Sequence, residues 1–348
     1  MNGEIIGVLP GEAARFLPQM YEWGIAVIRV IQELKSPVLT ALVKFITVLG
    51  TEALYLPMIL FIFWWIDEKR GLRLGILIIV CAWINSFVKD ILKQPRPFNL
   101  EPSVGLASEP SYGAPSGHAQ MSLCFWIPMA AWLDKVRPRR RLLIWAAAIF
   151  FVLLIAFTRL YLGVHFPTDI FAGWILAAII LFIWFVPGPS IEKFLAAGGT
   201  RLQNICAAGI VLVMNGLYPK ERTFPALFLG FCLGYTMMRR RFPFSARAEI
   251  NGRKPGITIM ILRCLTGFAG MVLIYLGLKL IFPGEGSLFK SIPAWGQASP
   301  YYELGRFIRY GLLGFWVSAG APLLFQRMRL ASVPVEGEDS PGTNGNTQ

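Results

Sequence analysis

Charged residues are scarce in this chain, and acidic residues are scarcer than basic ones. Only 15% of its 348 residues are Asp, Glu, Lys or Arg, whereas about 25% is usual for soluble domains. The net charge of +13 could indicate a nucleic-acid partner. However, the basic residues cluster in short stretches between apolar runs, as in cytoplasmic loops of membrane proteins, and no nucleic-acid-binding motif is present. We therefore expect a membrane protein with no nucleic-acid partner.

The five cysteines do not follow the spacing of a metal site or of a disulfide framework. Each lies within an apolar run, where a lone cysteine behaves as a small hydrophobic residue. The sequence also lacks a cluster of carboxylates that would suggest a metal ion. We therefore expect no metal and no other cofactor. The cysteines are Cys81, Cys124, Cys206, Cys232 and Cys264.

Long apolar runs are abundant, and 55% of the residues are hydrophobic. A helix needs about 20 apolar residues to cross a bilayer, and several runs approach this length. We predict an all-α fold, a polytopic transmembrane helical bundle. The predicted helices cover residues 37–50, 52–66, 71–92, 118–134, 142–160, 168–187, 203–217, 223–238, 257–282 and 308–326.

The segments outside these helices have distinct compositions. Residues 1–36 are predicted to be an N-terminal interfacial segment, because residues 20–36 are amphipathic. Residues 331–348 are polar, contain Gly and Pro, and are predicted to be a disordered tail. Gly230 and Gly234 form a pair of small residues one turn apart, which is typical of close helix packing.

Clusters of Lys and Arg predict the orientation in the membrane. If the predicted helices alternate in direction, four clusters fall on one side, which the excess of positive charge marks as cytoplasmic. Loop 93–117 and segment 159–167 then lie on the opposite, non-cytoplasmic side. The clusters are Lys69-Arg70 with Arg73; Lys135, Arg137 and Arg139-Arg140-Arg141; Arg239-Arg240-Arg241 with Arg247, Arg253 and Lys254; and Arg327 with Arg329.

The chain has only two histidines, and both lie in short polar motifs on the predicted non-cytoplasmic side. The first motif reads Pro115-Ser116-Gly117-His118 and directly precedes an apolar run. Its simplest interpretation is a helix start with serine as the N-cap. The same geometry presents free backbone N–H groups to an anion, while Gly117 allows close approach and His118 can supply a proton.

The second histidine, His165, is followed four residues later by Asp169. An aspartate bonded to one imidazole nitrogen fixes the tautomer and leaves the other nitrogen basic. Pro167 between them is compatible with the start of a helix. The alternative is a histidine in an interfacial loop and an aspartate that caps the following helix.

Three cations accompany these histidines. Lys89 lies in an apolar helix and, taken alone, could simply extend its amine to water; Arg96 precedes Pro97 and could be a solvated arginine at a helix end. Together with Arg159, however, they supply positive charge on the side that carries both histidines. Cations around the phosphoryl oxygens, a nucleophile and a proton donor are what phosphoryl transfer requires. We therefore predict metal-independent phosphoryl chemistry.

At this point the sequence resembles the type 2 phosphatidic acid phosphatase superfamily of integral membrane phosphatases. The family's three motifs correspond, in order and spacing, to Lys89 through Arg96-Pro97, to Pro115-Ser116-Gly117-His118, and to Thr158-Arg159 through His165 and Asp169. Thr158 replaces the usual serine of the third motif. The resemblance implies a six-helix membrane phosphatase core at residues 37–187, followed by about four additional transmembrane helices within residues 188–330.

The resemblance also implies a role for each site residue. His165 is expected to be the nucleophile that forms a phosphohistidine, Asp169 to orient it, and His118 to protonate the leaving group. The residues expected to bind the phosphoryl oxygens are Lys89, Arg96, Ser116, Gly117 and Arg159.

These expectations favour an enzyme that hydrolyses a lipid phosphate or a polyprenyl diphosphate at the non-cytoplasmic face, with membrane lipids as its surroundings. A sugar-phosphate phosphatase of the glucose-6-phosphatase type is an alternative, although the few cations of loop 93–114 favour a lipid. A non-catalytic lipid transporter or scaffold is a third possibility, against which both histidines argue. Because neither a long glycosylated ectodomain nor a retrieval signal is present, we expect a multi-pass protein of a bacterial cell membrane.

Overall fold

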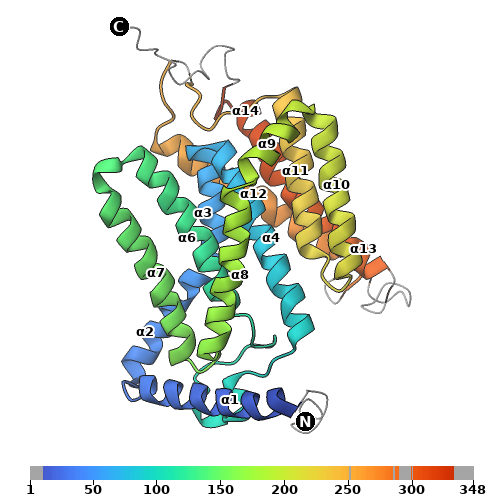
Figure 1. The fold of residues 1–348 in the computed structure, drawn as a ribbon. Coiled ribbons are helices and arrows are strands. Elements are labelled where there is room, and N and C mark those ends of the chain that lie inside the picture. The colour runs from blue at the N-terminus through green and yellow to red at the C-terminus, as the bar shows by residue number, and fades with distance from the viewer. Residues whose placement is uncertain (1–10, 251, 285–286, 290–298, 300, 333–348) are drawn as a thin grey trace. The chain divides into compact units, whose positions relative to one another are not determined.

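The computed structural model describes residues 11–250, 252–284, 287–289, 299 and 301–332, with the backbone alone for residues 11–17. The described residues form helices and loops, with one isolated β-bridge between Ile250 and Arg253 and no strand. Five helices are long and apolar enough to cross a membrane, or six if one bent pair counts as a single span. The predicted all-α, multi-pass membrane fold is therefore confirmed (Figure 1).

Each of the ten predicted apolar helices has a counterpart in the structure, and further helices lie between and before them. The helices are α1 (Gly11–Gln32), α2 (Pro37–Thr47), α3 (Glu52–Phe61), α4 (Glu68–Leu92), α5 (Pro97–Leu100), α6 (Gly117–Val136), α7 (Arg141–Tyr161), α8 (Pro167–Phe185), α9 (Gly188–Ala197), α10 (Gly199–Leu217), α11 (Thr223–Arg241), α12 (Ile257–Ile281), α13 (Tyr301–Phe315) and α14 (Ala321–Arg327). Two π-helical turns, η3 (Ile62–Ile66) and η7 (Trp316–Gly320), follow α3 and α13.

The chain forms two compact units. Unit 1 contains residues 1–56 and 80–189, and unit 2 contains residues 57–79 and 190–348. Residues 57–79 therefore pack with the C-terminal helices, although the sequence placed them in the six-helix core. Two boundaries between the units fall inside helices, one within α3 and one within α4, and not in linkers.

Helices α2 and α3 correspond to two separately predicted helices. They are joined through a short 3-10 turn, η2 (Val48–Gly50), and bend by 45° where the two parts meet. Neither is long enough alone to cross a bilayer, since a helix rises about 1.5 Å per residue. Together with η3 they are apolar enough to form one broken span.

In unit 1, helix α6 packs against both α7 and α8, and α2 lies along α7. Large apolar side chains project outward from α7 and α8, including Leu143 and Phe182, which are 66% and 64% exposed and so suit contact with lipid. Helix α1 lies across the ends of α7 and α8 (Figure 1). The side chain of Gln32 fixes it there by donating to the carbonyls of Val104 and Tyr161, each at 2.8 Å. Its location at the membrane surface stays a prediction.

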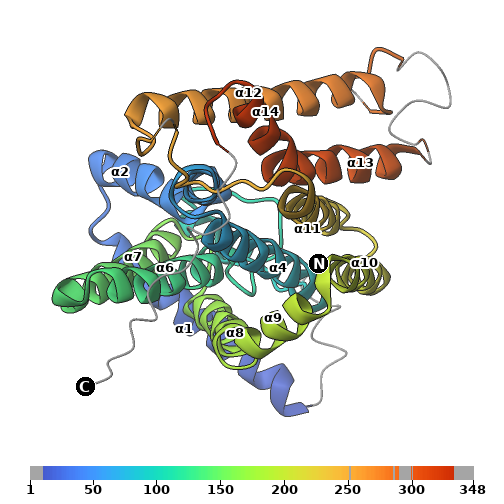
Figure 2. The same ribbon diagram turned by 90° about the horizontal axis from the view of Figure 1, so that it is seen from above.

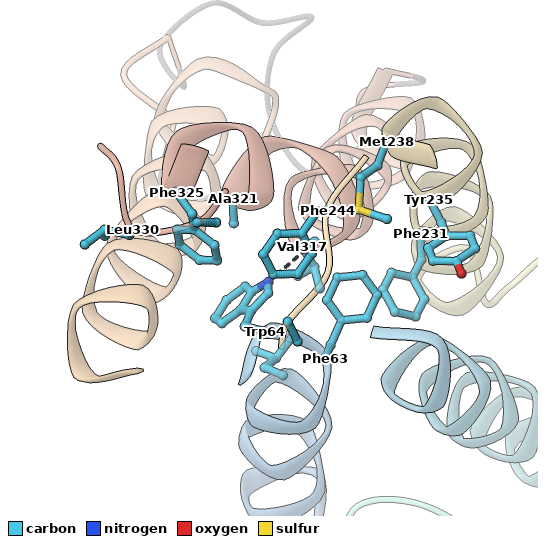
Figure 3. Close-up of a cluster of buried hydrophobic side chains, with 13 residues drawn as sticks. Phe63, Trp64, Phe231, Tyr235, Met238, Phe244, Val317, Ala321, Phe325 and Leu330 are labelled. Carbon is cyan, nitrogen blue, oxygen red and sulfur yellow. Dashed lines mark hydrogen bonds between the residues drawn. The ribbon is translucent and has the colours of Figure 1, made fainter. Parts of the chain in front are cut away.

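In unit 2, aromatic side chains from separate parts of the chain form the core (Figure 3). Trp64 packs edge-on against Phe325, and its indole N–H donates to the carbonyl of Val317 at 2.9 Å. Helices α12 and α13 lie side by side (Figure 2). A Cβ on Gly230 would lie 1.8 Å from the carbonyl oxygen of Gly311, so the predicted role of this glycine in helix packing is confirmed.

Unit 2 also buries an arginine completely. Arg263 of α12 donates to the backbone carbonyls of Trp64, Ala246 and Leu330 at 2.8, 2.9 and 3.0 Å. Three segments far apart in the chain are joined in this way. Of the predicted tail, Ala331 is buried in the same core, and residues 333–348 lie outside the described residues.

Candidate active site

Four helix ends of unit 1 bring the three sequence motifs together. Helix α4 ends at Leu92, shortly after Lys89, and α6 begins at Gly117. Helix α7 ends at Tyr161, and α8 begins at Pro167. The structure places all eight predicted site residues at these ends or in the segments between them.

The first histidine motif forms the start of α6, as the sequence predicted. Ser116 is the N-cap, and its Oγ accepts a hydrogen bond from the N–H of Ala119 at 3.5 Å. The N–H of Ser116 donates to the carbonyl of Asp169 at 2.9 Å, which ties this motif to the third one. The remaining free N–H groups of the first turn are therefore presented beside the second histidine motif.

Two buried amides support this turn from behind. Asn85 of α4 donates from Nδ2 to the carbonyl of Pro115 at 3.3 Å and to Oε1 of Gln120 at 2.7 Å. A Cβ on Gly117 would lie only 3.0 Å from Oδ1 of Asn85, so glycine allows this close approach. Gln120 in turn donates to the carbonyl of Cys81 at 3.2 Å. The position of the motif is thus fixed by side chains of α4 and α6.

His165 lies in the short connection between α7 and α8, not on a helix. Its Nδ1 lies 3.2 Å from Oδ2 of Asp169, and the same oxygen accepts the N–H of Phe166 at 2.9 Å. Asp169 thus acts in both of the ways that the sequence left open, as a partner of the histidine and as a cap of α8. Gly163 turns the chain here with a φ of 63°, a left-handed conformation that glycine adopts easily.

The other imidazole nitrogen of His165 faces a cation. Nη1 of Arg96 lies 3.2 Å from Nε2 of His165. Because a guanidinium can only donate, Nε2 accepts, and the proton of the neutral ring is assigned to Nδ1, next to Asp169. Burial of the side chain lowers the pKa of His165 well below its usual value, and the nearby charges of Arg96 and Arg159 lower that pKa further. The geometry therefore favours a neutral ring whose unprotonated nitrogen is Nε2, which accepts the hydrogen bond of Arg96.

A glutamate that the sequence had not singled out lies between the two arginines. One carboxylate oxygen of Glu109 is 2.8 Å from Nη2 of Arg96, and the other contacts Nη2 of Arg159. Burial alone would raise the pKa of Glu109, but the charges of Arg159 and Arg96 outweigh this effect and lower the pKa. Glu109 is therefore an anion held by two of the predicted phosphate-binding residues.

The loop beyond Glu109 also binds Arg96 and the third predicted cation, Lys89. Arg96 donates from Nε to the carbonyl of Ser111 at 2.6 Å and from Nη2 to its hydroxyl at 3.0 Å. Lys89 donates from Nζ to the carbonyl of Tyr112 at 2.8 Å. Lys89 and Arg96 do not share a continuous helix, because α4 ends between them, but both cations reach the same loop.

Besides Glu109, a second residue outside the motifs, Thr47, contacts Arg159. Its Nη1 donates to Oγ1 of Thr47 at 2.7 Å and lies 3.4 Å from Nε2 of His118. Among the residues that the structure describes, none accepts a hydrogen bond from the buried Nε of Arg159. An oxygen of a bound phosphoryl group could satisfy this donor. Thr158 instead donates to the carbonyl of Ile155 at 2.6 Å and lies 3.1 Å from Oγ1 of Thr47, so its hydroxyl supports the helix.

This arrangement combines an oriented histidine, a second histidine, three cations and a helix N-terminus. Such a set can bind a phosphoryl group and transfer it to an imidazole nitrogen. Within the described residues, no three His, Cys, Asp or Glu side chains are grouped so that they could hold a metal ion. A helical membrane protein with this set at its helix ends belongs to the class of membrane phosphatases.

Comparison with protein families identifies the particular family. The model of the PAP2 superfamily matches residues 70–188, which include all the predicted site residues, and a model of the transmembrane extension of PAP2 superfamily phosphatases matches residues 223–333. The chain belongs to the PAP2 superfamily, the family that its motifs resemble.

Curated relatives come from several kingdoms. The sphingosine-1-phosphate phosphatase 2 of Mus musculus is 24% identical over 318 residues, which cover 83% of this chain and 88% of the relative. The undecaprenyl-diphosphatase of Sulfolobus acidocaldarius is 28% identical and covers 42% of this chain and 68% of its own length. The phosphatidylglycerophosphatase B of Bacillus subtilis is also 28% identical, over 43% of this chain and 75% of its own length.

A solved structure is also similar. The crystal structure of a transmembrane PAP2 type phosphatidylglycerolphosphate phosphatase from Bacillus subtilis shares 25% sequence identity, with a TM-score of 0.43. The match covers 49% of this chain and 86% of the other. The bacterial membrane expected from the sequence stays a prediction, since the relatives include animal, archaeal and bacterial proteins.

Sequence reasoning missed several side chains that contact the site residues or support them, among them Glu109, Thr47, Asn85 and Gln120. The two amides could have been found, because a polar residue inside an apolar helix is a functional hypothesis by default. Glu109 and Thr47 gave no comparable signal, since a glutamate in a loop and a threonine near a helix end are ordinary. Only the folded chain brings them to Arg159.

Proposed function

We propose that this chain hydrolyses a lipid phosphate or a polyprenyl diphosphate through a phosphohistidine on His165. The observation that carries the proposal is the position of the His165 ring, with Asp169 at Nδ1 and Arg96 at Nε2. This arrangement leaves an unprotonated nitrogen beside a cation that can also hold a phosphoryl oxygen.

In the proposed reaction, Nε2 of His165 attacks phosphorus, and the bond from phosphorus to the leaving oxygen breaks. His118 gives its proton to that oxygen. Water then attacks the phosphohistidine and gives a proton to His118, so that inorganic phosphate leaves and both histidines return to their initial state. Lys89, Arg96, Arg159 and the N-terminus of α6 neutralise the phosphoryl charge in both steps, and no metal ion is invoked.

The relatives support a lipid substrate. Their names specify sphingosine 1-phosphate, undecaprenyl diphosphate and phosphatidylglycerophosphate, which all combine an anionic head with an apolar tail. A site at the ends of membrane-spanning helices suits this shape, because the head can bind at the helix ends while the tail stays in the bilayer.

We also propose that the site faces the non-cytoplasmic side. The predicted site residue Arg159 lies in the last turn of α7, whereas Arg139, Arg140 and Arg141 lie at its start. The length of α7 separates them by about 30 Å, the thickness of a hydrocarbon core. Because clustered basic residues mark the cytoplasmic end of a span, the site belongs to the other side.

The proposal is tested by phosphate release from detergent-purified protein in EDTA. The panel contains phosphatidic acid, phosphatidylglycerol phosphate, sphingosine phosphate, undecaprenyl diphosphate and glucose 6-phosphate. We expect turnover of at least one lipid, and loss of that turnover in His165→Ala. Turnover of glucose 6-phosphate alone would favour the sugar-phosphate alternative. A folded wild type as inactive as His165→Ala on every substrate would favour a transporter or scaffold.

A further inference from the structure

Glu109 occupies the position that a substrate phosphoryl group would need. Its two carboxylate oxygens contact Arg96 and Arg159, which approach the site from α5 and α7. The carboxylate is only 26% exposed, although the neighbouring residues Ser108 and Pro110 are on the surface. The loop therefore turns this one side chain inward toward the cations.

The donors of Arg96 show how completely the loop fills the site. Arg96 has five N–H donors, and all have partners: Nη1 is bound by the carbonyl of Val164 and by His165, and Nε and Nη2 by Ser111 and Glu109. The edge formed by Nε and Nη2 is one that can bind phosphate in a bidentate manner. A phosphoryl group can use this edge only after Glu109 and Ser111 have left it.

The carboxylate and a phosphoryl group differ in charge. Ionised glutamate carries one negative charge, whereas a phosphomonoester carries about −1.5 to −2 at neutral pH. A phosphodiester, which is the form of most membrane phospholipids, carries at most one negative charge at phosphorus. A diester has no more charge than the Glu109 carboxylate, so it gains no electrostatic advantage in the competition for the two arginines. A monoester or a terminal diphosphate carries more negative charge and can displace the carboxylate.

We propose that Glu109 is a specificity-determining residue: an internal anion that substrate must displace from Arg96 and Arg159, and that thereby excludes the phosphodiesters of the surrounding membrane. The inference rests on the proposed function and adds the basis of its selectivity. Bulk phospholipids are present around the site at far higher concentration than any lipid phosphomonoester. A site with free arginines would therefore bind diesters for most of the time.

Displacement of Glu109 affects binding more than the chemical step, because the carboxylate leaves before phosphorus is attacked. Glu109→Gln keeps the shape of the side chain and removes its charge. Glu101→Gln is the matched control, because Glu101 lies in the same outer loop and pairs with the exposed Arg29 at 2.9 Å, away from the cations of the site. Glu109→Asp keeps the charge on a shorter side chain that cannot bridge both arginines as well.

The experiment measures binding of inorganic phosphate to the purified full chain by calorimetry, and inhibition of phosphomonoester turnover by phosphatidylglycerol in mixed micelles. We expect the Kd of phosphate to fall about tenfold or more in Glu109→Gln, which corresponds to one charge-assisted hydrogen bond no longer displaced. The decrease in the Kd of phosphate should be smaller in Glu109→Asp and absent in Glu101→Gln. Phosphatidylglycerol should inhibit Glu109→Gln and not the wild type, while kcat changes less than KM.

Phosphate binding to Glu109→Gln and Glu109→Asp that is no tighter than to the wild type would overturn the inference, because Glu109 would then only hold the arginines in place. Tighter phosphate binding without inhibition by phosphatidylglycerol would overturn the selectivity against diesters. The binding measurement does not depend on turnover. A wild type that binds phosphate but releases none from any substrate would therefore count against the proposed function and not against the competition by Glu109.

Discussion

Oδ2 of Asp169 lies 3.2 Å from Nδ1 of His165 and 2.9 Å from the backbone nitrogen of Phe166. One carboxylate oxygen thus fixes the imidazole ring and starts α8, so the ring position is tied to the helix and not to a free loop. A histidine without this partner could rotate or carry its proton on the wrong nitrogen. The orientation of the His165 ring and the start of α8 therefore depend on the same side chain.

Asp169→Asn should reduce kcat by about 10²–10⁴-fold while the chain stays folded. The amide can still accept the N–H of Phe166, so α8 begins as before, but it carries no charge to support the proton on Nδ1. The measurement is kcat against a lipid phosphate together with the thermal unfolding midpoint. A loss of kcat that follows a loss of folded protein would show that Asp169 acts only as a helix cap.

The pH profile should report the ionisation of His165. Burial and the neighbouring Arg96 and Arg159 lower the pKa of this ring, so it stays neutral at pH 6.5 and gains a proton only at more acidic pH. The charged ring cannot attack phosphorus, so kcat/KM should fall on the acid side with a midpoint below the usual histidine value. Because His118 must be protonated to act as the acid, kcat/KM should also fall as the pH rises past the pKa of His118, which gives a bell-shaped profile.

Ionisation of the substrate itself could produce a similar acid limb, and Asp169→Asn provides the control. Loss of the carboxylate lowers the basicity of His165 and should move the acid limb to lower pH, whereas the ionisation of the substrate is the same for both proteins. An acid limb that coincides in the two proteins would assign it to the substrate. A profile that stays level down to about pH 4 would contradict the assigned roles of both histidines.

Thr47→Val should weaken catalysis by loosening Arg159. The substitution keeps the shape of the side chain and removes the acceptor that lies 2.7 Å from Nη1 of Arg159. We expect kcat/KM to fall about fivefold, the value of one ordinary hydrogen bond, mostly through KM. Thr40→Val is the matched control, because Thr40 lies on the same helix and its hydroxyl instead contacts that of Tyr161 at 2.9 Å. Equal effects of the two substitutions would contradict a specific role for Thr47.

The Asn85–Gln120 pair should behave as one unit. Asn85→Leu removes the partner of a buried amide oxygen, which costs about 1–3 kcal/mol of stability and loosens the turn at Ser116. The double substitution Asn85→Leu with Gln120→Leu should cost less than the sum of the two single ones, because neither amide is then left alone. Unfolding midpoints of the four proteins in detergent measure this coupling. Additive effects would mean that the two amides act independently.

Accessibility from the two sides of the membrane tests the proposed orientation. Ser103 is an exposed residue of the segment between α4 and α6, and Arg140 lies in the basic turn before α7. In intact cells, a membrane-impermeant thiol reagent should label Ser103→Cys and spare Arg140→Cys, with labelling of both after lysis. The unsubstituted chain shows the background from its own cysteines. The reverse pattern would place the site on the cytoplasmic side.

The sequence was sufficient to predict the ten apolar helices and the starts of two of them. Apolar runs of membrane length have few alternatives to a helix, because every backbone polar group must be paired inside the segment. Ser116 before Gly117 is a local N-cap signal, and the structure confirms it. The Pro167 signal similarly predicted the start of α8. Such signals depend only on residues that are neighbours in the chain, so the start of a helix can be predicted from the sequence alone.

The grouping of helices into units could not be predicted in the same way. Residues 57–79 were expected in the phosphatase core because the family resemblance implies a six-helix core at residues 37–187. They pack instead with the C-terminal helices through Phe63 and Trp64, which contact Phe231 and Phe325. An apolar residue in a membrane helix contacts lipid or protein equally well, so its partner is decided by shapes that are distant in sequence.

The loop that carries Glu109 shows the same limit within the site. The composition of residues 93–114 predicted an outer loop with few cations, and this description was used to favour a lipid substrate. The contacts of Glu109 with Arg96 and Arg159 depend on the path of the loop over the site. A local motif cannot encode such a path, since Arg96 and Arg159 are 63 residues apart in the chain.

The central claim is that His165 becomes phosphorylated, and trapping the intermediate tests it most directly. The enzyme would be His118→Ala, and the substrate an aryl phosphate whose leaving group needs no proton, such as p-nitrophenyl phosphate. The account predicts a burst of up to one equivalent of nitrophenol and an alkali-stable phosphoryl group on His165, located by mass spectrometry, because water attack lacks its base. Steady turnover with no burst and no phosphohistidine, or phosphate on another residue, would contradict it.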